Sequence, residues 1–289
     1  MIDEQKGLYT VKSCPWLLLF VFFLQFVTGE MMDILWAQCF GEKAPGLLLL
    51  ACVQIFSVAI PCGVFILLKN VNPKEIIKHR KLYGVTGIMC VVAGAAAQPI
   101  AALLNSPVAI HTSDSTALLA ETPTTAFSFV LTLIVIAVMP AFFEEILMRG
   151  IVLHATEKYG YRASLFISAI WFAILHNSFA NIPGMLFLGF VSCYAVWMTQ
   201  SVYAGMLIHF SFNATGLIFQ TTGFPQSNTM AIITLIISVL LFVPALSSLN
   251  RKLVRRYKTH GLFKQIFFAI FNFPMIIILL GFVMFHFTR

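Results

Sequence analysis

Apolar segments long enough to cross a lipid bilayer follow one another along most of the chain. A membrane-spanning helix needs about 20 apolar residues, and lipid tolerates only backbone whose polar groups are satisfied internally. Hydrophobic residues make up 60% of the 289 residues and charged residues 10%, against about 45–50% and 25% in soluble domains. The sequence therefore predicts an all-α polytopic transmembrane helical bundle of about eight or nine spans. The candidate spans are 15–39, 46–68, 82–105, 126–148, 163–180, 183–200, 202–221, 229–247 and 266–287.

The basic residues lie between alternate spans, which predicts an orientation. With a cytoplasmic N-terminus, sixteen of the 18 lysines and arginines face the cytoplasm, and Lys43 and Arg289 do not. We therefore expect a multi-pass protein of the plasma (cell) membrane. The basic segments 71–81 and 251–264 fit contact with anionic lipid, so the net charge of +7 reflects topology and not a nucleic-acid partner. The six cysteines show no paired spacing and are interpreted as small core residues.

Two adjacent carboxylates interrupt the fourth apolar run. Residues 126–139 carry no charge, and Glu144 and Glu145 follow within the sequence PAFFEEILMRG. A charge inside a membrane is costly and usually faces a protein interior where it has a function. On a helix Glu145 and Arg149 are i,i+4 neighbours and can pair, whereas Glu144 points about 100° away with no local cation. Glu144 is therefore the carboxylate left for another role.

Two further polar sets lie on later spans. Phe172 and His176 occur in WFAILHN, and His209 and Asn213 occur in IHFSFN, each pair four residues apart. Glu144 and His176 are each 16 residues from Gly160, where a helical hairpin is expected, so both should lie at one depth. His209 lies about ten residues beyond the expected cytoplasmic turn near Gln200. The sequence predicts one site in the membrane, closer to its cytoplasmic face.

These residue types have a common chemical interpretation. A carboxylate and an imidazole that face each other, Glu144 and His176, can hold a water molecule and remove its proton. His209 and Asn213 would donate hydrogen bonds to the oxyanion of a tetrahedral intermediate. In this hypothesis Glu145 and Arg149 orient the helix, and Phe172 shields the site from bulk water.

The three sets together resemble a known family. EEILMR fits its EExxxR signature, FAILH its FxxxH signature and HFSFN its HxxxN signature, in that order and on separate helices. Over about residues 139–216 the chain is similar to the CAAX prenyl protease 2 and related (CPBP or Abi) family of intramembrane glutamic proteases. The resemblance implies that Glu144 activates water, assisted by His176, and that His209 and Asn213 form the oxyanion site. It implies a peptide or membrane-associated protein substrate, with or without a C-terminal lipid, in contact with membrane lipid.

Other readings of the same cluster remain open. Glu, His and His can bind zinc, but HExxH is absent and Asn213 is a poor ligand, so no metal or other cofactor is expected. A non-proteolytic membrane scaffold, a bacteriocin self-immunity protein or a transporter could use the cluster for binding, although no internal repeat typical of many transporters is present. We expect N-terminal transmembrane helices over 1–125, a catalytic four-helix core over 126–221 and C-terminal transmembrane helices over 222–289.

Overall fold

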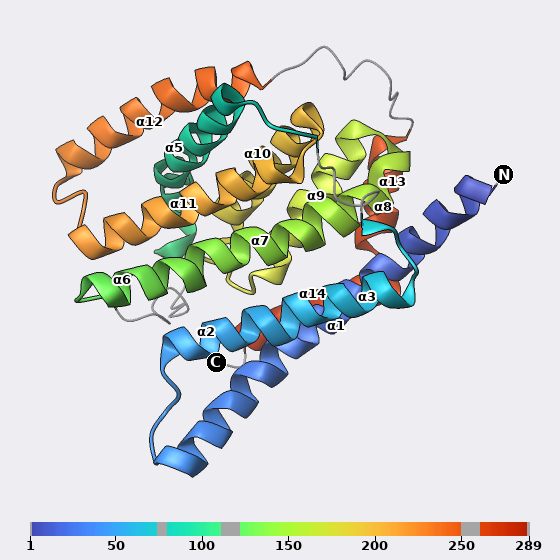
Figure 1. The fold of residues 1–289 in the computed structure, drawn as a ribbon, viewed down its shortest axis with the longest axis horizontal. Helices are drawn as coiled ribbons and strands as arrows, with labels where there is room; N and C mark the ends of the chain where they lie inside the picture. The colour runs from blue at the N-terminus through green and yellow to red at the C-terminus, as the bar shows by residue number, and fades with distance from the viewer. Residues whose placement is uncertain (1, 74–79, 111–121, 250–260, 288–289) are drawn as a thin grey trace.

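The chain folds into a bundle of helices (Figure 1). The computed structural model describes residues 2–73, 80–110, 122–249 and 261–287, and no β-strand occurs within them. The helices are α1 (Ile2–Phe40), α2 (Gly46–Cys52), η1 (Val53–Ala59), α3 (Ile60–Leu68), α5 (Gly84–Ala109), α6 (Ala126–Leu133), η3 (Ile134–Val138), α7 (Met139–Glu145), η4 (Ile146–Val152), α8 (Leu153–Thr156), η5 (Glu157–Tyr159), α9 (Tyr161–Leu175), α10 (Ile182–Thr199), α11 (Val202–Thr222), α12 (Asn228–Ser248), α13 (Leu262–Ile270) and α14 (Phe273–Phe287). The predicted polytopic helical bundle is confirmed.

In the described part of the chain, seven helices are long and apolar enough to cross a membrane, and a bent pair raises the number to eight. Two of the nine predicted spans are shorter or broken in the structure. The span predicted over 163–180 is the 15-residue helix α9, which ends at Leu175. It ends there because Asn177 adopts a left-handed conformation with φ 47°, which asparagine tolerates better than most residues. The span predicted over 266–287 is broken into α13 and α14, which meet at 66°.

The span predicted over 126–148 is longer in the structure. A continuous helical segment of 34 residues runs from Ala126 to Tyr159 through α6, η3, α7, η4, α8 and η5. Gly160 ends it at φ 87°, a conformation that glycine adopts without steric cost, and α9 starts at the next residue. The hairpin predicted about Gly160 is therefore present.

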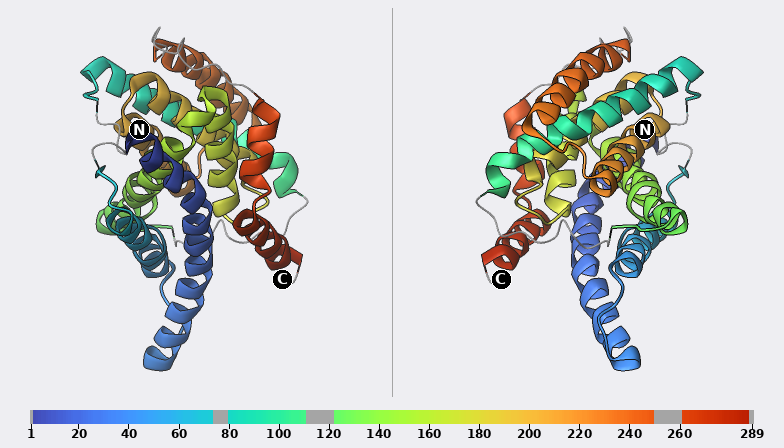
Figure 2. Two further views of the ribbon diagram at one scale, coloured as in Figure 1. Left: turned by 90° about the vertical axis from the view of Figure 1, so that its right-hand side faces the viewer. Right: turned by 90° about the vertical axis from the view of Figure 1, so that its left-hand side faces the viewer.

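The helices lie in successive layers across the bundle. α1 and α3 lie on one side of α7, and α11, α5 and α12 follow on the other side (Figures 1 and 2). α10 packs against α9, α11 and α5. α7 therefore lies in the interior, with η1 on one face and α11 on the other.

Small residues allow close packing in these layers. A Cβ built on Gly94 of α5 would collide with the Ser211 hydroxyl and the Ile208 carbonyl of α11. A Cβ on Gly189 of α10 would lie 2.9 Å from the Ala169 Cα of α9. Lipid is as apolar as the helix surfaces, so the hydrophobic effect does not drive membrane helices together, and their association depends on such close packing. These glycines bring the polar residues of separate helices within reach of one another.

Several turns lie at one end of the bundle. The Tyr161 and Trp197 rings are 5.4 Å apart, which places the Gly160 turn beside the end of α10. The Arg80 amide donates to the Gln200 carbonyl at 3.2 Å, so the segment before α5 meets the α10–α11 turn. Basic residues Arg80, Lys158 and Arg162 belong to this end. The predicted cytoplasmic residues Lys74, Lys78, Arg251, Lys252, Arg255, Arg256 and Lys258 lie outside the described residues.

Candidate functional site

The helix that carries both glutamates departs from regular α-helical bonding. Pro140 has no N–H to donate to the carbonyl of Ile136, and the preceding residues 134–138 form the π-helix η3. The Asn213 side chain on α11 donates from Nδ2 to this Ile136 carbonyl at 2.9 Å. Asn213 therefore fastens α11 to the segment just before Glu144.

Glu145 and Arg149 form the predicted ion pair. Arg149 Nη1 lies 2.7 Å from Glu145 Oε1, and both side chains are fully buried. The same carboxylate oxygen lies 3.1 Å from His209 Nδ1, and Arg149 Nη2 donates to the Gly189 carbonyl at 3.2 Å. A carboxylate paired with arginine only accepts hydrogen bonds, so His209 Nδ1 carries a proton. The second glutamate thus holds the histidine of α11 and, through Arg149, the backbone of α10.

Gly205 makes room for this arrangement. A Cβ on Gly205 would collide with Glu145 Oε2 and would lie 3.0 Å from a methyl carbon of Val196. α11 can therefore approach α7 closely enough for His209 to reach Glu145 only with glycine at this position. The sequence motifs did not include this residue.

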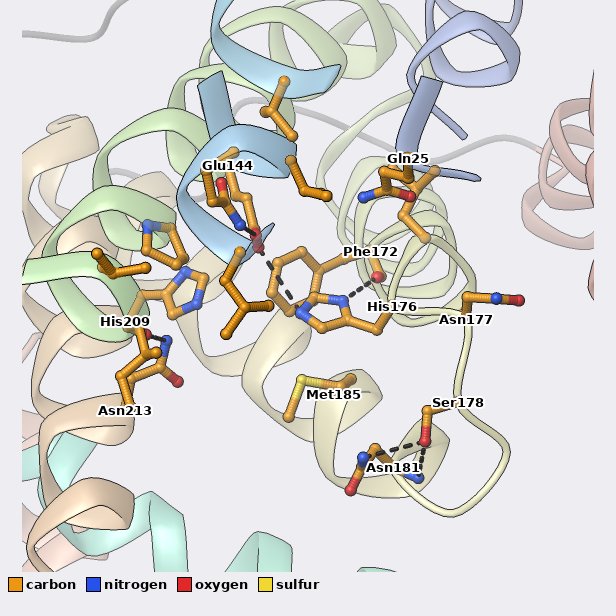
Figure 3. Close-up of a pocket in the computed structure, with 18 of the residues that line it drawn as sticks. Gln25, Glu144, Phe172, His176, Asn177, Ser178, Asn181, Met185, His209 and Asn213 are labelled. Atoms are coloured by element: carbon orange, nitrogen blue, oxygen red, sulfur yellow. Dashed lines mark hydrogen bonds and ion pairs between the residues drawn. The ribbon is translucent and has the colours of Figure 1, made fainter. Parts of the chain in front are cut away.

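Phe172 joins the two histidines and the arginine. Its side chain is 1% exposed, and its ring centroid lies 4.5 Å from that of His176 and 5.6 Å from that of His209, both edge-on. The Arg149 guanidinium carbon lies 4.6 Å from the same centroid, a cation–π contact. Phe172 packs among these groups and fills the space between the histidines (Figure 3).

Glu144 faces His176, as the equal spacing from Gly160 predicts. Glu144 Oε2 lies 3.7 Å from His176 Nε2, and the side chains are 15% and 27% exposed (Figure 3). His176 Nδ1 lies 2.8 Å from the Phe172 carbonyl, which can only accept, so Nδ1 is the donor. In a neutral ring, Nε2 then presents its lone pair towards Glu144. The gap is too long for a direct hydrogen bond.

A cavity of about 740 Å³ opens beside these two side chains. Its volume falls in the range of about 300–1,000 Å³ that ligand sites occupy, and apolar surface predominates in a wall that also carries many polar side chains. Glu144, Phe172, His176, His209 and Asn213 all line it. Glu145 and Arg149 lie behind the wall and support it.

The structure also brings a residue to the site that the motifs did not identify. Gln54 of η1 donates from Nε2 to Glu144 Oε1 at 2.7 Å, across 90 residues of sequence. Gln54 lies outside residues 126–221, where the catalytic four-helix core was expected. Gln54 is the one amide in the long apolar run 46–68, which is a usable signal, but an uncharged side chain is less conspicuous there than a carboxylate.

No group of three or more His, Cys, Asp or Glu side chains is placed to share a metal ion within the described residues. Glu144 and His176 face each other, but His209 directs its Nδ1 to Glu145. Asn177, next to His176, points away from Glu144 (Figure 3).

Comparison with known proteins finds one family that the region around this site resembles. Residues 126–215 match the model of the Rce1-like family, described as type II CAAX prenyl endopeptidase Rce1-like. No curated protein and no solved structure matches the chain. The matched region contains all three motifs and every residue that they predicted. Residues 126–215 of this multi-pass membrane protein are therefore similar to a family of CAAX-type prenyl endopeptidases.

Proposed function

We propose that the protein is an intramembrane glutamic-type endopeptidase in which Glu144 and His176 activate a water molecule. The observation that carries this proposal is the pair of acceptor atoms, Glu144 Oε2 and His176 Nε2, held 3.7 Å apart at the wall of the cavity. A water about 2.8 Å from each atom fits beside the line that joins them and can donate a hydrogen bond to both. Its lone pair then points away from the protein groups and towards a substrate carbonyl.

The reaction follows from these positions. Water oxygen attacks the carbonyl carbon of the scissile peptide, and Glu144 takes the proton that the water releases. The tetrahedral intermediate collapses when the C–N bond breaks, and the proton passes from Glu144 to the departing nitrogen. The products are a carboxylic acid and an amine, and Glu144 returns to its carboxylate form. His176 orients the water through Nε2.

His209 and Asn213 are proposed to stabilise the oxyanion. His209 Nδ1 is the donor to Glu145, so its other nitrogen can donate to an oxyanion only when the ring is an imidazolium. The Glu145 carboxylate lies beside the His209 ring and would pair with its positive charge, while it also pairs with Arg149. Asn213 uses one N–H of its amide for the Ile136 carbonyl and keeps a second for the substrate.

The location of the chemistry is part of the proposal. His209 lies seven residues, or about 10 Å, from the start of α11. That end carries the Gln200 turn, which faces the cytoplasm if the N-terminus does. The site would then lie in the cytoplasmic half of the plasma membrane, within reach of a peptide or a membrane-associated protein whose C-terminus carries or lacks a lipid. No cofactor enters this mechanism.

Peptide cleavage tests the proposal. Purified protein in nanodiscs is incubated with quenched-fluorescence peptides, both farnesylated CaaX sequences and unlipidated ones. Glu144→Gln and His176→Ala should each abolish or strongly reduce cleavage, since general acid–base groups contribute about 10²–10⁴-fold. His154→Ala is the matched control, because His154 of α8 does not line the cavity.

The outcomes separate the possibilities. Cleavage lost in Glu144→Gln and His176→Ala but kept in His154→Ala supports the assignment and identifies the peptides accepted. Cleavage that survives both site substitutions overturns it. Loss in all three variants, with lowered thermal stability, would mean that damage to the fold and not to the chemistry is being measured.

A further inference from the structure

Gln54 lies beside the reacting carboxylate but comes from outside the family segment. It belongs to η1, whereas the match to the family covers residues 126–215. Its Nε2 donates to Glu144 Oε1 at 2.7 Å, a charge-assisted contact. Such contacts are about twice as strong as hydrogen bonds between neutral groups.

This contact divides the two oxygens of Glu144 between different partners. Oε1 accepts from Gln54, and Oε2 faces His176. The terminal torsion of a glutamate side chain is broad and roughly two-fold, so an untethered carboxylate samples many orientations. A donor fixed on Oε1 keeps Oε2 turned towards His176, where the proposed water is held.

Gln54 is itself held by the N-terminal helices. Ser57 of the same π-helix is fully buried and donates to the Thr28 hydroxyl of α1 at 3.1 Å. η1 packs against both α1 and α7. π-helical turns within α-helices frequently occur at functional sites, since they redirect side chains that a regular helix would place elsewhere. The Gln54 amide is therefore presented to Glu144 by a supported scaffold.

Gln54 carries no charge, which suits a residue that orients Glu144. Among the described residues that line the cavity, the ionisable side chains are Glu30, Asp33, Glu144, His176 and His209, with no lysine or arginine. A lysine or arginine paired with Glu144, as Arg149 is paired with Glu145, would stabilise the ionised carboxylate and so weaken it as a base. An amide orients the carboxylate without neutralising it.

We infer that Gln54 is a positioning residue of the active site, which orients Glu144 through a hydrogen bond from outside the catalytic four-helix segment. The inference rests on the proposed function for its effect on catalysis. The contact itself can be tested without any substrate.

The first test measures cleavage in nanodiscs. Gln54→Met keeps the length and roughly the volume of the side chain but removes the donor, and should lower kcat by about 10- to 100-fold. Gln38→Met is the control, because Gln38 of α1 is exposed and does not line the cavity. It should change kcat by less than about threefold.

Gln54→Glu distinguishes positioning from simple packing. The new carboxylate has the shape of the native side chain but would face Glu144 as a like charge, so it should be less active than Gln54→Met at neutral pH. When the pH is lowered, a proton shared by the two carboxyls restores a donor. The activity ratio of Gln54→Glu to Gln54→Met should then rise. Glu30 and Asp33 of α1, His176 at the C-terminal end of α9 and His209 of α11 line the same cavity in both variants, so the ratio cancels their titration.

The second test needs no activity. Thermal unfolding is followed for Gln54→Met, Glu144→Ala and the double variant. If the hydrogen bond exists, Gln54→Met should lower Tm in the native background and change it far less in the Glu144→Ala background. The Gln38→Met control should shift Tm equally in both backgrounds.

The outcomes separate this inference from the proposed function. Strictly additive Tm changes would overturn the role of Gln54 and leave the protease assignment intact. Cleavage by Gln54→Met equal to that by Gln38→Met, while Glu144 remains essential, would do the same. Non-additive Tm changes would support the contact between Gln54 and Glu144. If cleavage nevertheless did not require Glu144, the proposed function would be refuted, and with it the role of Gln54 in catalysis.

Discussion

Replacing Arg149 with methionine should destabilise the protein strongly, because the arginine is the main partner of a buried carboxylate. The substitution removes the 2.7 Å contact with Glu145, the 3.2 Å hydrogen bond to the Gly189 carbonyl and the cation–π contact with Phe172. Glu145 would remain fully buried with His209 as its other neighbour. Removing one partner of a buried ion pair typically costs about 3–5 kcal/mol. The three losses are not additive, so the same range applies to the whole substitution.

A double substitution shows where that cost arises. When both charges are replaced by groups of similar volume, a buried ion pair is often dispensable. Glu145→Gln combined with Arg149→Met should therefore lie within about 1–2 kcal/mol of the native protein, which makes it more stable than Arg149→Met alone. Arg162→Met serves as a control, since Arg162 is exposed on the same hairpin and should change stability by less than about 0.5 kcal/mol.

The assay is unfolding by SDS in mixed micelles, followed by far-UV circular dichroism. The reasoning would be refuted if Arg149→Met cost less than about 1 kcal/mol, or if the double variant were less stable than Arg149→Met. Either result would mean that the isolated Glu145 carboxylate is tolerated in this interior. The charge of the cluster would then not be what holds α7, α10 and α11 together.

Two other predictions concern packing and orientation. Gly94→Ala should lower the free energy of unfolding by about 1–3 kcal/mol, because the added methyl collides with Ser211 and the Ile208 carbonyl; Gly87→Ala, whose Cβ would meet only Leu207 at 3.7 Å, should be nearly neutral in the same SDS titration. In a Cys52→Ser background, a membrane-impermeant maleimide should label Cys39 in intact cells, since this exposed thiol lies next to the end of α1 that the proposed orientation places outside. Labelling of Cys39 only after lysis would reverse that orientation, and the buried thiols of Cys14, Cys62, Cys90 and Cys193 should stay unreactive in both conditions.

Features that depend on local spacing could be predicted from the sequence. The i,i+4 ion pair of Glu145 and Arg149 and the turn at Gly160 follow from positions within a few residues of one another. The meeting of Glu144 and His176 also follows locally, because a hairpin brings residues at equal distances from its turn to one level. The composition was enough to predict the helical class.

Contacts between helices that are distant in sequence could not be predicted in the same way. His209 was expected to donate to an oxyanion, and its contact with Glu145 through Nδ1 was not predicted. That contact requires α11 to approach α7 closely. Gly205 permits this approach, but the hydrophobic periodicity of the sequence does not predict it. Gln54 escaped notice for the same reason, since its partner lies 90 residues away.

The end of α9 was misjudged because apolar composition does not reveal a left-handed residue. Asn177 stops the helix one residue after His176, so the imidazole lies at a helix end and not within a span. The bend between α13 and α14 lies at residues 271–272, where Asn272 and the nearby Pro274 interrupt a run that is otherwise apolar and was taken as one span.

The length of the helical segment that carries Glu144 links the site to the thickness of the membrane. Its 34 residues extend about 50 Å, and fitting them into a hydrocarbon core of about 30 Å would require a tilt of about 50°, beyond the usual 0–40°. One end must therefore emerge from the hydrocarbon, and the end with Glu157 and Lys158 is the polar one. Glu144 lies 18 residues from Ala126, or about 27 Å. Hydrophobic mismatch then acts on the carboxylate directly: a thinner bilayer brings it towards the headgroups and their water, and a thicker one draws it into the lipid core.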